Sequence, residues 1–297
     1  KNRFGVNYIA LSQQKPLTLY IATNVGQIFS TKEPGAPSPK WKQITTRSVG
    51  PERWATTGLE AIALPQSIEI DPAHPEVLYI AYGDHGIFKS EDGGKTVSLL
   101  PNRPGTYGGS LILDEFKPGR LYLGTRGPHL QLRDGTAWQS DDSGRNWRSL
   151  AGRKAASGKS LPPGAITSVR VQYVDRDGRN IYMANYKQGV YRLDDSMQWR
   201  QIFARAGCHA LAARKDFQEL YVGVDGEGIF KLTRQGDKWQ SALVAPKTAE
   251  TGETFFDMET GSETGTIYIG TSKGVFALTA TDKLEKRLAL PDTMALE

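Results

Sequence analysis

Several acidic residues stand in short glycine-containing turns, where they could contact a ligand. Asp84, Asp225 and Glu227 occupy comparable positions in two such turns. Glycoside hydrolases generally use two carboxyl groups about 5 to 10 Å apart. Asp also tolerates tight turn geometry, so the alternative is that these residues only shape their turns. The pattern favours the second interpretation and leaves the first open, and we assign no catalytic residue.

Two histidines fall in corresponding turns of neighbouring segments. They are His85 and His129, and Asp84 adjoins the first. A His–carboxylate pair would permit a weak metal site, whereas two exposed turn histidines need no metal. Cys208 is the single cysteine, which excludes an internal disulfide and a multi-cysteine zinc site. We therefore expect no metal and no cofactor.

Arginine, lysine and aromatic residues accompany these turns. Arginine beside an exposed aromatic ring is typical of protein interfaces and also suits a sugar platform. The segment 45–60, which holds Arg53 and Trp54, is longer than a minimal connection between strands and is a candidate binding loop. The candidate binding residues are Arg53, Trp54, Tyr82, Asp84, His85, Arg103, Tyr107, Arg126, His129, Tyr186, Lys187, Asp225 and Glu227.

A repeated pattern of strands must position these turns. An apolar–Tyr–apolar segment, a short polar turn with glycine and an apolar–aromatic segment recur six times, with a mean spacing of about 50 residues. Alternation with period two and enrichment in β-branched and aromatic residues indicate strands rather than helices. The repeated tyrosines are Tyr20, Tyr79, Tyr122, Tyr182, Tyr221 and Tyr268.

Each repeat also has an upstream and a downstream strand, so it contains four. Ser67–Ile70 is one upstream strand, and Trp199 and Trp239 open two downstream strands. In the third repeat we expect the apolar–aromatic strand in a degenerate form at Leu130–Leu132. One four-stranded sheet cannot bury both of its faces, so the sheets must stack around an axis. The predicted fold is all-β, a β-propeller of six, alternatively seven, four-stranded antiparallel blades in one domain, 1–297.

Two turns between third and fourth strands carry a sharper motif. They read Ser-Glu-Asp-Gly-Gly-Lys-Thr-Val at 90–97 and Ser-Asp-Asp-Ser-Gly-Arg-Asn-Trp at 140–147. Both resemble the Asp-box pattern Ser-x-Asp-x-Gly-x-Thr-Trp of bacterial neuraminidase-type repeats. Val97 replaces the Trp in the first copy and Asn146 the Thr in the second. The residues that match this motif are Ser90, Asp92, Gly94, Thr96, Ser140, Asp142, Gly144 and Trp147.

The resemblance covers the chain at the level of the repeat. It implies a propeller similar to those of sialidases, xyloglucanase-like hydrolases, sortilin-type receptors and photosystem II assembly factors, and a structural role for the motif residues. Such a fold supports many functions. The Arg-Ile-Pro segment of sialidases is absent. We expect a non-catalytic propeller that binds a protein partner or assembly client through a basic, aromatic-containing loop face. The alternative is a glycoside hydrolase or a lectin-like, carbohydrate-binding propeller.

Charge and hydropathy limit the partners. The net charge is +5, which favours an anionic protein or glycan but is too small for a nucleic-acid-binding signature. The sequence contains no run of about 18 apolar residues, so it predicts no transmembrane helix. The chain begins at Lys1, which fits either a removed signal peptide or a trimmed chain. We expect a secreted or periplasmic monomer.

Overall fold

The computed structural model describes residues 6–12, 17–23, 28–33, 36, 38–44, 47–48, 65–82, 86–102, 104, 108–125, 135–150, 161–162, 164–173, 178–193, 197–214, 216–261, 265–271 and 273–289. Every regular element within these ranges is a β-strand. The same ranges contain no helix with the length and apolar character needed to cross a bilayer.

The strands of the first half form three sheets. Blade 1 contains β1 (Val6–Leu11), β2 (Leu19–Thr23), β3 (Ile28–Thr31) and β4 (Lys42–Gln43). Blade 2 contains β6 (Pro65–Ile70), β7 (Leu78–Tyr82), β8 (Gly86–Ser90) and β9 (Thr96–Leu99). Blade 3 contains β10 (Gly108–Leu113), β11 (Leu121–Thr125), β12 (Ala137–Ser140) and β13 (Arg148–Ser149).

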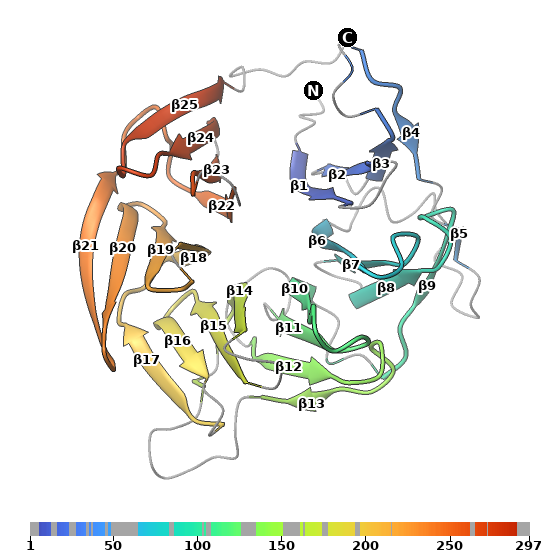
Figure 1. Cartoon of the computed structure of the whole chain (residues 1–297), viewed down its shortest axis with the longest axis horizontal. Coiled ribbons are helices and arrows are strands. Elements are labelled where there is room, and N and C mark those ends of the chain that lie inside the picture. The colour runs from blue at the N-terminus through green and yellow to red at the C-terminus, as the bar shows by residue number, and fades with distance from the viewer. Residues whose placement is uncertain are drawn as a thin grey trace. The chain divides into compact units, whose positions relative to one another are not determined.

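The second half repeats this organisation (Figure 1). Blade 4 contains β14 (Ile166–Tyr173), β15 (Arg179–Asn185), β16 (Gly189–Leu193) and β17 (Trp199–Phe203). Blade 5 contains β18 (Cys208–Arg214), β19 (Glu219–Val224), β20 (Gly228–Gln235) and β21 (Lys238–Pro246). Blade 6 contains β22 (Phe255–Thr260), β23 (Ile267–Thr271), β24 (Gly274–Leu278) and β25 (Leu284–Ala289).

The predicted fold class is confirmed. The described residues form six four-stranded antiparallel blades of the propeller type, each with its strands paired in sequence order. This order follows from the short connections, because a tight turn joins only antiparallel neighbours. The chain divides into two compact units, with blades 1 to 3 in the first and blades 4 to 6 in the second. The expectation of a single domain stays a prediction.

Two details differ from the sequence-based expectation. The third strand of blade 3 is β12, Ala137–Ser140, whereas residues 130–132 lie outside the described residues. The reason lies in the motif that resembles the Asp box, which we call the Asp-box turn for brevity. It begins with the last residue of the third strand in both copies, Ser90 in β8 and Ser140 in β12. In addition, β5 (Arg47–Ser48) pairs in parallel with β9 and adds a fifth strand to the second sheet.

Five of the six repeated tyrosines are buried in the hydrophobic cores, whereas Tyr268 of blade 6 is 48% exposed. Tyr20 of blade 1 packs in one cluster with Ile68 and Ile80 of blade 2. Tyr182 of blade 4 packs in the same way with Leu211 and Val222 of blade 5. Full burial of one large apolar side chain contributes about 1.5 to 3 kcal/mol, so these contacts between sheets stabilise each unit.

The two Asp-box turns have the same hydrogen bonds. In the first, Ser90 Oγ accepts the Gly94 amide at 2.8 Å and Asp92 Oδ1 accepts the Thr96 amide at 2.9 Å. In the second, the equivalent bonds from Gly144 and Asn146 measure 2.9 and 2.8 Å. The Asn146 side chain also donates to Asp142, as the Thr96 hydroxyl does to Asp92. Asn therefore replaces Thr without loss of the bond.

The glycine of each turn receives a side chain from the preceding blade. Gly94 and Gly144 have φ angles of +85° and +83°. A Cβ atom on Gly94 would lie 2.7 Å from the Ile44 side chain, and one on Gly144 would lie 2.5 Å from that of Leu100. Ile44 follows β4 and Leu100 follows β9, so equivalent residues of blades 1 and 2 pack onto the turn of the next sheet. The motif thus fixes the packing of successive blades.

Candidate functional site

The structure describes five of the thirteen predicted binding residues, and it brings three of them into one cluster. Tyr186, Asp225 and Glu227 stand in the turns that join second to third strands in blades 4 and 5, as does the exposed Lys187. Tyr82 is described but is not exposed. The predicted residues outside the described ranges are Arg53, Trp54, Asp84, His85, Arg103, Tyr107, Arg126 and His129.

Tyr82 is a core residue rather than a surface residue. Its side chain is 1% exposed and packs edge to face on Phe88, with 5.3 Å between the ring centroids. None of the residues with described positions bonds to its buried hydroxyl, and burial raises the pKa of this phenol. The residue is the last of β7, and all five residues of that strand are buried. We therefore remove Tyr82 from the candidate binding surface.

Asp225 lies at the centre of the cluster, in the β19–β20 turn. One carboxylate oxygen accepts the Phe255 backbone amide at 3.1 Å. The other oxygen lies 2.9 Å from His209 Nδ1 and accepts the Tyr186 hydroxyl at 3.2 Å. Asp225 therefore joins the three blades of the second unit at their turns.

Tyr186 and His209 are held in fixed positions by this carboxylate. Burial and the negative charge of Asp225 raise the pKa of Tyr186, so its hydroxyl stays protonated and donates. The ring of Tyr186 meets that of His209 edge to face, with 5.8 Å between centroids. Phe256 meets the same imidazole at 6.2 Å, also edge to face. The result is a row of three rings, which we call the ring row, and its outer member, Phe256, is 51% exposed.

Phe256 and His209 reach this position through irregularities in the sheets. The pairing of β18 with β19 shifts between Cys208 and Ala210, so His209 is the extra residue of a β-bulge. The pairing of β22 with β23 shifts between Phe255 and Asp257, which makes Phe256 the equivalent residue of blade 6. A bulge redirects a side chain at the start of a strand and is common beside binding sites.

Sequence reasoning missed both residues. All six blades show a register shift at the start of the first strand, at equivalent positions. The sequence does offer one signal for such a bulge: the residue just before the regular apolar–polar alternation of each first strand. This residue is His209 in blade 5 and Phe256 in blade 6.

Ion pairs surround the ring row. Arg205 pairs with Glu227 at 2.5 Å and lies over the Phe230 ring, 4.7 Å from its centroid. Lys247 pairs with Glu253. Glu227 and Glu253 are therefore each paired with a basic side chain, and the expectation of a basic face stays a prediction.

The thiol next to the ring row is not reactive. Cys208 donates to the Arg205 carbonyl at 3.2 Å, and burial raises the pKa of the thiol to about 12. Because the thiolate is the nucleophilic form, this group stays inert near neutral pH. Among the residues with described positions, no three His, Cys, Asp or Glu side chains are placed to hold a metal ion.

The arrangement suits binding better than acid–base chemistry. Asp225 accepts from Tyr186 and Phe255 and contacts His209, Glu227 is paired with Arg205, and Glu253 with Lys247. A glycosidase needs one carboxyl group that can give up a proton to the leaving oxygen and a second that acts on the sugar or on water. The most exposed group of the cluster is instead the aromatic ring of Phe256, which lies against the imidazole of His209.

Comparisons with known proteins support the fold and give one hint about ligands. No model of a known protein family matches this sequence. A probable oligoxyloglucan-reducing end-specific xyloglucanase of Neosartorya fischeri is 25% identical over 203 residues, which cover 62% of this chain and 22% of the relative. The corresponding xyloglucanase of Emericella nidulans is 26% identical over 157 residues, 48% of this chain and 17% of the relative. The chain thus spans about a fifth of the length of these curated relatives.

Several solved propellers superpose on almost the whole chain. An ancestral GH74 enzyme has a TM-score of 0.68 at 12% identity and matches 97% of this chain and 39% of its own. The extracellular domain of a putative hybrid two-component system from B. thetaiotaomicron has a TM-score of 0.67 at 12% identity, with 97% and 35% covered. YCF48 from Cyanidioschyzon merolae has a TM-score of 0.61 at 13% identity, with 96% and 88% covered. At these identities the likeness shows a shared propeller fold and leaves the ligand to be inferred from the site.

Proposed function

We propose that this chain is a non-catalytic propeller of the Asp-box superfamily that binds an oligosaccharide at the ring row. The observation that carries the proposal is the exposed Phe256 ring beside a histidine that Asp225 and Tyr186 hold in place. A flat apolar ring next to fixed polar edges can stack on the C–H face of a sugar while its hydroxyl groups form hydrogen bonds.

The geometry pre-organises the site. His209 is 7% exposed as a residue and Asp225 is only partly exposed, so neither side chain needs to be ordered when the ligand arrives. Binding then costs less conformational entropy than it would with mobile side chains. The similarity to two xyloglucanases supports a xyloglucan oligosaccharide as the first ligand to test.

Hydrolysis is the alternative. The carboxylates of Asp225 and Glu227 argue against it, because both already contact other groups of the protein. A catalytic acid at this cluster would have to break existing contacts of Asp225 or Glu227 before each turnover. The similarity to xyloglucanases involves about a fifth of each relative, so their activity does not transfer with it.

A protein partner is the second candidate. The structural match to YCF48 extends over 88% of that chain, so a propeller of this size constitutes most of a related molecule. Arg205 and Phe256 are exposed enough to contribute to a protein interface. An extracytoplasmic location is part of the proposal, supported by the match to an extracellular domain, and we propose that the protein acts as a monomer.

Two measurements on the same protein test the proposal. A glycan array identifies which oligosaccharides bind, and a panel of chromogenic glycosides detects turnover. We expect binding without turnover, and we expect Phe256→Ala to reduce the affinity at least tenfold. Phe116→Ala is the matched control, because Phe116 is 57% exposed in the β10–β11 turn and lies in the other unit.

Other results would change the assignment. Release of product from any glycoside of the panel would favour the hydrolase. An empty array, together with capture of a protein that requires Arg205 and Phe256, would favour the second candidate.

A further inference from the structure

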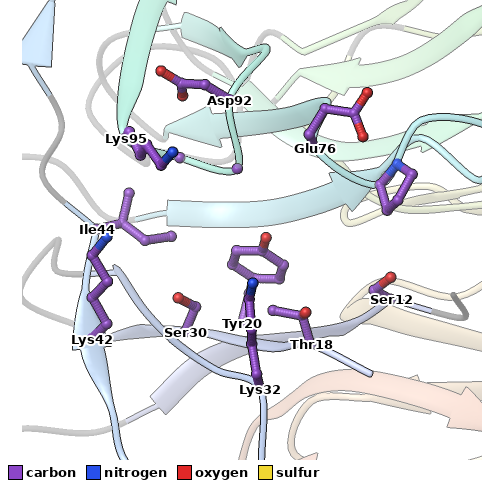
Figure 2. A pocket seen from close by; sticks show the side chains of 13 residues that line it. Ser12, Thr18, Tyr20, Ser30, Lys32, Lys42, Ile44, Glu76, Asp92 and Lys95 are labelled. Atoms are coloured by element: carbon purple, nitrogen blue, oxygen red, sulfur yellow. The ribbon is translucent and has the colours of Figure 1, made fainter. Parts of the chain in front are cut away.

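A cavity of about 420 Å³ lies between blades 1 and 2, remote in sequence from the ring row (Figure 2). Its lining includes residues of the β1–β2, β6–β7 and β8–β9 turns, and the last of these is the Asp-box turn of blade 2. Pockets of about 300 to 1,000 Å³ accommodate small organic molecules. All its lining residues belong to the first unit.

The apolar wall and floor of this cavity are formed by buried core residues. Tyr20 and Ile44 are 5% and 6% exposed and belong to the core between the two blades. The Tyr20 hydroxyl points into the cavity in Figure 2. Burial raises the pKa of this phenol, so the group remains a hydrogen-bond donor. No residue in the described part of the chain bonds to that hydroxyl or to the Ser30 side chain beside it.

Three lysines from separate segments line the cavity. Lys32 follows β3, Lys42 lies in β4, and Lys95 lies in the Asp-box turn of blade 2. Among the described residues none of the three forms an ion pair, whereas Lys89 and Lys231 do. Three ammonium groups that line one cavity repel each other, and an anion bound in that cavity would relieve the repulsion.

The acidic residues of the cavity do not balance this charge. Asp92 accepts hydrogen bonds from the amide and hydroxyl of Thr96, so the turn already uses its carboxylate. Glu76 is the other acid in the lining. Three cations therefore face two carboxylates, of which one is engaged within its own turn.

We propose that this cavity binds an oxyanion, a phosphate, sulfate or carboxylate group carried by a small organic molecule. The lysines supply charge, the Tyr20 and Ser30 hydroxyls supply donors, and the apolar wall contacts the rest of the molecule. Charge-assisted hydrogen bonds from lysine to such oxygens are among the stronger polar contacts in proteins. The site is independent of the ring row and of the ligand proposed there.

Calorimetric titration of the whole chain tests this site. The probes are inorganic phosphate, inorganic sulfate, acetate, glucose 6-phosphate and glucose. We expect glucose 6-phosphate to bind more tightly than inorganic phosphate, and glucose not to bind at the cavity. Lys42→Met combined with Lys95→Met should weaken the binding of glucose 6-phosphate at least tenfold. Lys40→Met is the matched control, since Lys40 is exposed two residues before Lys42 and does not line the cavity.

Three outcomes would overturn the proposal: no binding of any anion, equal affinity for glucose and glucose 6-phosphate, or equal weakening by Lys40→Met and by the double variant. Substitution of exposed lysines usually changes stability by less than about 0.5 kcal/mol, so the variants should fold. Lys42→Gln with Lys95→Gln, checked by thermal unfolding, gives a second pair of variants for the same comparison.

Discussion

Single residues connect the blades of the second unit through shared polar contacts. Asp225 does so at the candidate site, where it accepts from Tyr186 and Phe255 and contacts His209. Asp282, in the β24–β25 turn, does so elsewhere. It accepts from Arg214, Tyr221 and Lys231 of blade 5 at 2.7, 2.7 and 3.0 Å. The first carboxylate lies beside an exposed ring, and the second lies among largely buried groups.

Asp282→Asn should destabilise the protein by about 3 kcal/mol, because the change leaves the Arg214 guanidinium, 5% exposed, without its carboxylate. Asn suits the position otherwise, since Asp282 has a φ of +61° and Asn tolerates the left-handed region. Urea unfolding at pH 7 measures the difference. Asp237→Asn, at an exposed turn between β20 and β21, is the control and should change the free energy of unfolding little.

The same carboxylate makes stability depend on pH. Burial alone would raise the pKa of Asp282, but hydrogen bonds from Tyr221 and Lys231 outweigh it and lower the pKa. A carboxyl whose folded pKa is lowered stabilises the fold fully above its ordinary pKa, near 3.9, and loses that contribution as the pH falls through the folded value. The difference between wild type and Asp282→Asn should therefore be constant from about pH 5 to 7 and shrink below about pH 4. A difference that grows toward acid pH would contradict this assignment.

At the scale of the strands, glycine at the start of the third strand permits the fourth strand to approach. Gly228 begins β20 with a φ of +136°, and a Cβ atom there would lie 2.3 Å from the Ala245 carbonyl oxygen. Gly189 begins β16 with a φ of +115°, and a Cβ atom would lie 2.0 Å from the Phe203 carbonyl oxygen. Blades 4 and 5 therefore both require a residue without a Cβ atom at the first position of the third strand.

Gly228→Ala should therefore destabilise the protein by more than about 2 kcal/mol, because it combines backbone strain with a clash against backbone. Gly236→Ala is the matched control. Gly236 also has a positive φ, of +60°, but a Cβ atom there would meet nothing within 4 Å, so only the strain of about 1 to 2 kcal/mol remains. Thermal or urea unfolding of both variants compares the two costs. Equal losses would show that the close approach of β21 is unimportant.

The strands were the part of the fold that the sequence predicted best. Alternation of apolar residues around the repeated tyrosines indicated second strands, and all six are present. The third strand of blade 3 was misplaced at Leu130–Leu132, although Ala137 and Trp138 of β12 match the apolar–aromatic pattern and Ser140 begins the adjoining motif. The two-residue strand β5 was missed since it pairs in parallel with a distant strand, which no local pattern records.

At the scale of the whole molecule, the two proposed sites use no common residue and lie in different compact units. One ligand can change the affinity for the other only through a structural element whose conformation both ligands affect. The described contacts of the two sites include no such shared element. We expect saturation with glucose 6-phosphate to change the affinity for an oligosaccharide by less than about twofold. Titration of the oligosaccharide with and without the phosphate measures this, and a change of tenfold would indicate a shared element.

The candidate site was only partly predictable from the sequence. Turns between second and third strands were expected to carry ligand-binding residues, and Tyr186 and Asp225 do lie together there. His209 and Phe256 were not foreseen, because bulges place them at the ring row, and a bulge depends on register between strands. The oxyanion cavity was also not foreseen, since its lysines come from two blades.

The central claim is that the ring row binds an oligosaccharide and leaves it intact. Calorimetric titration with a xyloglucan oligosaccharide, followed by analysis of the recovered sugar for new reducing ends, tests it most directly. We predict saturable binding to the wild type, at least tenfold weaker binding to Phe256→Ala, unchanged binding to Phe116→Ala, and no new reducing ends. Equal affinity of the wild type and Phe256→Ala, or cleavage of the bound oligosaccharide, would contradict the claim.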